Sequence, residues 1–93
     1  MTKRIFIIHG WDGYPKEGWF PGLERELEKR GFLVLVPAMP EPAKPQIDKW
    51  VAHLSVLVGE PDENTYFVGH SIGCQAILRY LETVSNKRVG GVV

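Results

Sequence analysis

Cysteine is nearly absent from this chain, which has Cys74 alone among its 93 residues, so internal disulfide bonds cannot hold the fold together. No apolar run approaches the roughly 20 residues that a membrane-spanning helix needs. Only four apolar residues separate Arg4 from His9, too few for the apolar segment of a signal peptide. The chain also has no excess of positive or negative charge, because eleven Lys and Arg residues balance eleven Asp and Glu residues and neither kind forms a block. We therefore expect a cytoplasmic protein that binds neither nucleic acid nor a membrane.

Nucleotide-binding fingerprints are also missing. Neither Gly-x-Gly-x-x-Gly nor Gly-x-x-x-x-Gly-Lys-Ser/Thr occurs, which argues against a nucleotide as the ligand. What is present is a composition with 44% hydrophobic and 24% charged residues, which is typical of a globular chain. Because the length is at the low end of the usual range for a domain and no repeat or linker is visible, we expect one domain over residues 1–93.

Apolar residues alternate along the chain between short continuous runs and helical spacing, which predicts a parallel α/β fold. We expect strands over 4–8, 32–36, 65–68 and 89–93, and helices over 19–30, 47–58 and 72–84. Right-handed crossovers would place helices on both faces of the sheet, and we expect the strand order 2-1-3-4. In such a sheet the binding site lies at the carboxyl ends of the first and third strands.

Two loops have unusual compositions. Residues 9–18, after the first strand, contain three glycines and a proline, which is typical of a functional loop rather than a simple connection. Residues 37–45 contain four of the seven prolines. Two Pro-x-x-Pro windows in that segment would fit a ligand of a polyproline-binding domain, but a stiffened loop inside an ordinary domain is the favoured interpretation.

The third expected strand leads directly into the sequence Gly-His-Ser-Ile-Gly, residues 69–73, and a helix follows. This is the pattern of a nucleophile elbow, in which a sharp strand-to-helix turn forces Ser71 into a strained backbone conformation. Gly69 and Gly73 would give the two elements room to approach. The Ser71 hydroxyl would then be exposed, and the backbone N–H of Ile72 would point at an oxyanion beside it. The alternative is a serine that only caps the helix in a glycine-rich turn.

With these residues in view, the sequence resembles the α/β-hydrolase superfamily and, within it, the small serine hydrolases similar to retinoblastoma-binding protein nine. The matching features cover essentially the whole chain: the His9-Gly10 loop, the Gly-Trp-Phe that begins at Gly18, Met39-Pro-Glu-Pro42 and the Gly69–Gly73 turn.

The resemblance implies a function and a set of site residues. Ser71 would be the nucleophile, and the N–H of Ile72 and a loop N–H near Trp11 would form the oxyanion hole. The substrate would be a small molecule, an ester, thioester or amide of a small acyl group. We expect no cofactor and no metal.

This chain departs from the family in its length. Family members place the catalytic acid and base after the nucleophile, and the corresponding positions would lie beyond Val93. We expect no substitute among the histidines: His70 adjoins Ser71, His53 lies on a helix face, and His9 is expected to have a structural role rather than that of a base. The chain is therefore interpreted as the N-terminal half of a serine hydrolase, inactive alone. The alternative is a non-catalytic remnant or interaction module. An open sheet edge at the C-terminus would allow self-association.

Overall fold

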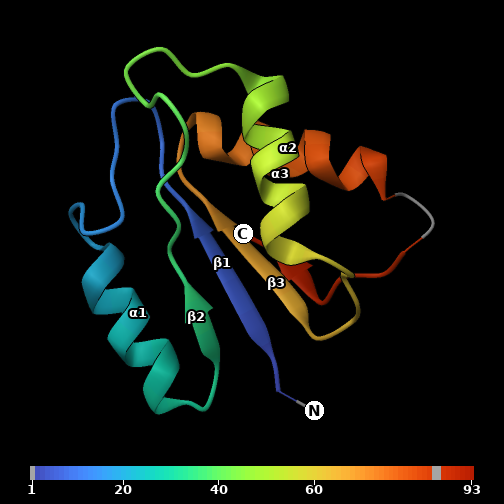
Figure 1. Ribbon diagram of the computed structural model, residues 1–93. Helices are drawn as coiled ribbons and strands as arrows, with labels where there is room; N and C mark the ends of the chain where they lie inside the picture. Colours follow the sequence, from blue (N-terminus) through green and yellow to red (C-terminus); the bar gives the residue numbers. More distant parts are fainter. Residues whose placement is uncertain (1, 85–86) are drawn as a thin grey trace.

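The computed structural model describes residues 2–84 and 87–93, and in this part of the chain strands and helices alternate (Figure 1). The elements are β1 (Arg4–Ile8), α1 (Phe20–Lys29), β2 (Leu33–Leu35), α2 (Ile47–Val58), β3 (Thr65–Gly69), α3 (Ile72–Thr83) and β4 (Gly91–Val92).

The strands form one parallel sheet with the order β2-β1-β3-β4, which confirms the predicted order. β1 and β3 are the central strands, and they pair along their whole length, from Arg4 with Thr65 to Ile8 with Gly69. Since the strands are parallel, their carboxyl ends lie side by side. The loop after β1 and the turn after β3 therefore leave the sheet at adjacent points (Figure 1).

The two outer strands are shorter than the sequence predicts. β2 ends at Leu35, two residues before Pro37, which has no N–H to donate to a neighbouring strand. β4 covers Gly91–Val92, although flanking hydrogen bonds extend its pairing with β3. The N–H of Gly90 donates to Thr65 at 2.7 Å and that of Val93 to Phe67 at 2.9 Å.

Side chains of β1 alternate between two apolar layers, one on each face of the sheet. Phe6 and Ile8 pack with α2 and α3 on one face, whereas Ile5 and Ile7 pack with Phe20 of α1 on the other. This alternation follows from the two-residue period of a strand and explains why β1 reads as a continuous apolar run. Helices cover both faces, as predicted.

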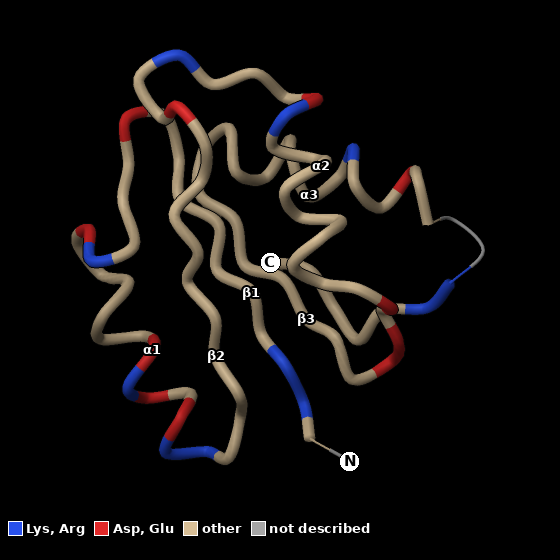
Figure 2. The backbone as a smooth tube through the Cα atoms, in the orientation of Figure 1, with Lys and Arg blue, Asp and Glu red and all other residues tan. Residues whose placement is uncertain are grey.

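Charged residues lie mainly on helices and in loops, with both signs on α1 (Figure 2). An exception is Arg4 at the start of β1, whose guanidinium donates to the carbonyl of Val58 at 3.0 Å and to the hydroxyl of Thr65 at 3.2 Å. These bonds connect the start of β1 to the end of α2 and to the start of β3. Within the described ranges, every helix is too short or too polar to cross a membrane.

Candidate active site

Ser71 lies between the end of β3 and the first residue of α3, with φ 57° and ψ −124°. A positive φ is strained for a residue with a Cβ, and such strain concentrates at functional sites. The Ser71 side chain is exposed. The chain therefore makes the sharp strand-to-helix turn that the glycine spacing predicts, with the hydroxyl accessible from solvent.

Close backbone approaches explain the glycines on either side of Ser71. A Cβ on Gly69 would lie 2.9 Å from the backbone N of Cys74. A Cβ on Gly73 would collide with the carbonyl oxygen of Ile8 and lie 2.6 Å from that of His9. α3 therefore begins directly against the end of β1, and a larger residue at either position would push the helix away.

Ile72 begins α3, so its N–H has no intrahelical acceptor. The next two N–H groups are engaged, because Gly73 donates to the carbonyl of His70 and Cys74 to that of Ser71, each at 3.0 Å. Within residues 2–84 and 87–93 the Ile72 N–H has no hydrogen-bond acceptor. The positive end of the helix dipole lies at the same point, which favours an anionic oxygen beside Ser71.

Residues 9–18, here called the glycine loop, lie against the Ser71 turn. A Cβ on Gly10 would be 3.0 Å from the Cβ of Ser71 and 3.0 Å from the carbonyl oxygen of His70. Trp11 follows with an exposed indole whose Nε1 donates to the carbonyl of Ala43 at 2.9 Å. Its backbone N–H donates to no acceptor in the described part of the chain. The glycine loop, which includes Trp11, therefore lies beside Ser71.

Of the three histidines, His9 is the one whose two ring nitrogens both form hydrogen bonds in the described part of the chain. Its ring is 1% exposed, with Nδ1 2.9 Å from the carbonyl oxygen of Gly10 and Nε2 3.0 Å from the N–H of Met39. The sequence predicts a structural role for His9, and the structure adds the two hydrogen-bond partners of its side chain.

The other two histidines are not hydrogen-bonded to the serine. His70 is exposed, and its ring makes edge-on contacts with Trp19 and Phe20, with centroids 6.0 and 6.2 Å apart. His53 is half-exposed on α2. Among the described residues, no histidine donates to or accepts from Ser71.

Glu17 is a residue that sequence reasoning missed. Its Oε1 is buried without a hydrogen-bond partner in the described part of the chain, and it would lie 2.7 Å from a Cβ on Gly13. Nothing in the pattern of residues 9–18 distinguishes this carboxyl from a solvated one. Its burial arises from the course of the glycine loop.

Comparison with known proteins gives consistent matches. A family model described as serine hydrolase matches residues 5–93. The protein YdeN of Bacillus subtilis (strain 168) is 40% identical over 94 residues, which cover 100% of this chain and 50% of YdeN. Serine hydrolase RBBP9 of Rattus norvegicus is 34% identical over 84 residues, which cover 88% of this chain and 45% of RBBP9.

The same relationship is found among solved structures. The crystal structure of the ydeN gene product from B. subtilis matches with a TM-score of 0.86 and 38% sequence identity, over 98% of this chain and 50% of that one. This chain therefore spans about half the length of the relatives that it matches.

Proposed function

Because the chain belongs to the serine hydrolase family, we propose that Ser71 is the nucleophile that cleaves an ester, thioester or amide of a small acyl group. The observation that supports this proposal best is the placement of Ser71. Its side chain is exposed, its φ is positive, and it directly precedes α3 and lies beside the glycine loop. A hydroxyl presented in this way is accessible to an acyl carbon and adjoins N–H donors.

The reaction proceeds in two acyl-transfer steps. A general base removes the Ser71 proton as Oγ attacks the acyl carbon, and the carbonyl electrons move onto oxygen. The N–H groups of Ile72 and Trp11 donate to this oxyanion. When the tetrahedral intermediate collapses, the bond to the alcohol, thiol or amine breaks and the leaving group takes up the proton. Water then attacks the acyl-enzyme by the same route and releases the acid.

The general base and its acid partner are proposed to come from residues after position 93. Both ring nitrogens of His9 are hydrogen-bonded elsewhere, and His53, on α2, forms no hydrogen bond with Ser71 in the described part of the chain. The chain covers 50% of YdeN, which leaves room for further catalytic residues in proteins of that length. Since positioned general bases contribute roughly a hundredfold to ten-thousandfold, residues 1–93 alone are expected to hydrolyse activated esters very slowly.

Hydrolysis of p-nitrophenyl acetate and labelling by a fluorophosphonate test the proposal in the protein of full natural length. Ser71→Ala should lower kcat/KM by about 10⁴-fold or more and abolish labelling. Ser55→Ala is the matched control, because Ser55 is an exposed serine on α2, and this variant should retain wild-type activity. Fast labelling of a peptide of residues 1–93 would show that a base lies within it.

The alternative is a non-catalytic interaction module with the same fold. The exposed side chains of Val92 and Val93 at the sheet edge favour this reading, since an uncovered edge supports pairing with a second chain. Sedimentation of residues 1–93 measures such self-association. A natural-length protein that neither turns over ester nor reacts with the fluorophosphonate would favour this alternative over the hydrolase.

A further inference from the structure

Residues 37–45, here called the proline loop, form three hydrogen bonds with the glycine loop beside the candidate site. The contacts are hydrogen bonds between His9 and Met39 at 3.0 Å, Trp11 and Ala43 at 2.9 Å, and Asp12 and Pro42 at 2.7 Å. Prolines restrict the backbone of this segment, so it offers the glycine loop a stiff neighbour. The proposed chemistry of Ser71 does not by itself explain these contacts.

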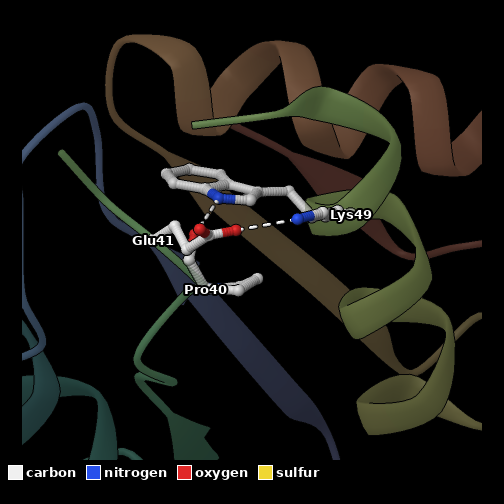
Figure 3. A network of polar contacts seen from close by, with 4 residues as sticks. Pro40, Glu41 and Lys49 are labelled. Atoms are coloured by element: carbon white, nitrogen blue, oxygen red, sulfur yellow. Dashed lines mark hydrogen bonds and ion pairs between the residues drawn. The ribbon is translucent and has the colours of Figure 1, made fainter. Parts of the chain in front are cut away.

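The proline loop is in turn attached to α2 (Figure 3). The indole Nε1 of Trp50, a residue with 0% exposure, donates to the carbonyl of Pro40 at 2.7 Å. Lys49 and Glu41 also form an ion pair at 2.9 Å, visible in the same view. Exposed ion pairs stabilise little, so the bond from the buried Trp50 is the stronger attachment. The loop therefore has a fixed position relative to the core.

The two hydrogen bonds of His9 identify the tautomer of its ring. Because the Met39 N–H is a donor, the His9 Nε2 beside it must be the acceptor. In a neutral imidazole the other nitrogen then carries the proton, so Nδ1–H donates to the carbonyl of Gly10 at 2.9 Å. His9 thus connects the proline loop to a single peptide unit, the one between Gly10 and Trp11.

That peptide unit includes the N–H proposed as an oxyanion donor. The Gly10 carbonyl accepts from the His9 ring and from the Gly13 N–H, the latter at 3.1 Å. The described chain contains no cis peptide bond, so the Trp11 N–H points away from the Gly10 carbonyl across a planar unit. Any group that fixes the direction of this carbonyl also fixes the direction of the Trp11 N–H.

We propose that His9 is a positioning residue, supported by the proline loop, that orients the Gly10–Trp11 peptide so that the Trp11 N–H faces an oxyanion formed at Ser71. This inference rests on the proposed function of Ser71. Removal of the contact between His9 and Gly10 should reduce transition-state stabilisation without changing how the ground-state substrate binds.

Two substitutions of His9 separate its two hydrogen bonds. In His9→Asn the side-chain amide can take the place of Nδ1 and donate to Gly10. In His9→Gln the longer side chain can take the place of Nε2 and accept from Met39, but the bond to Gly10 is lost. His53→Gln makes the same chemical change at a half-exposed position of α2 and serves as the control.

The experiment measures kcat and KM for p-nitrophenyl acetate in the protein of full natural length, with reactive sites counted by fluorophosphonate titration. His9→Gln should lower kcat per titrated site by about 10- to 100-fold with KM little changed, since a misplaced catalytic group costs up to about 100-fold. His9→Asn should recover most of this loss, and His53→Gln should match wild type. Counting sites removes the effect of any unfolded fraction.

The outcomes distinguish the two proposals. Equal kcat per site in wild type and His9→Gln, or equal losses in His9→Gln and His9→Asn, would overturn the role of His9 while leaving the hydrolase intact. A wild-type protein that neither turns over ester nor labels would overturn both. A loss confined to KM would assign His9 to substrate binding and would likewise contradict a positioning role.

Discussion

The two faces of the sheet are closed to different degrees. On one face, here called the closed face, α2 and α3 cover the strands, and Trp50, Leu54 and Phe67 have 0% exposure. On the other face α1 packs alone, and Trp19 at its start remains 49% exposed. A cavity of about 700 Å³ lies on this second face, and the residues that line it include Trp19, Leu23, Leu27, Tyr66 and Val68.

The difference shows which face supports the candidate site. Ser71 directly precedes α3, which lies on the closed face, and Gly73 fits against the backbone of β1 there. The proline loop is attached through Trp50 on the same face. Ser71 and the glycine loop therefore depend on the closed face for their positions, whereas the face under α1 contributes mainly Trp19 and Phe20 beside His70.

A pair of tryptophan substitutions should give the largest difference between the faces. Trp50→Ala should lower the free energy of unfolding by about 3–5 kcal/mol, because it leaves a buried cavity and removes the bond to Pro40. Trp19→Ala should cost about 1 kcal/mol or less, because half of this side chain is already in water. Urea unfolding followed by far-ultraviolet circular dichroism measures both. Equal losses would mean that α1 closes its face as tightly in solution as α2 and α3 close theirs.

Two helix glycines give the next contrast. Gly73→Ala should cost about 1–3 kcal/mol, because the new Cβ meets the backbone carbonyls of Ile8 and His9. Gly22→Ala in α1 has nothing within 4 Å of the added Cβ and should raise stability by about 0.5–1 kcal/mol through helix propensity. Thermal unfolding compares them, and a neutral Gly73→Ala would show that α3 can move away from β1 at little cost.

Sequence reasoning was most successful where a local pattern determines the structure. Unbroken apolar runs predicted β1, and apolar residues at helical spacing predicted the bounds of α2. The glycine spacing around Ser71 predicted a turn that the backbone angles confirm. In each case the deciding physics lies within a few residues: the period of apolar side chains, or the space that a Cβ would need.

Contacts between distant segments could not be predicted in this way. The hydrogen bond between His9 and Met39 joins residues 30 positions apart, and it depends on the backbone course of two loops. The burial of the Glu17 carboxyl likewise depends on the residues that the glycine loop contacts. Sequence periodicity does not show which loops pack together, so it predicts residues 37–45 as a stiffened loop without identifying the glycine loop as its neighbour.

The smallest expected effect concerns a hydroxyl on the closed face. Tyr80 is 1% exposed, and its OH has no hydrogen-bond partner among the described residues. Burial raises the pKa of this phenol above its ordinary value, since the charged form would lose its hydration. A buried hydroxyl without a partner costs free energy in the folded state, so Tyr80→Phe should raise stability by up to about 1 kcal/mol.

The matched control for this substitution is Tyr66→Phe on the face under α1. Tyr66 is half-buried and lines the cavity, so loss of its hydroxyl should leave the melting temperature nearly unchanged. For a domain of this size, 1 kcal/mol corresponds to a rise of about 4–8 °C in Tm, which calorimetry resolves. A Tyr80→Phe variant that melts below wild type would mean that the Tyr80 hydroxyl donates a hydrogen bond in solution, and the closed face would then be less completely apolar than the packing of α2 and α3 indicates.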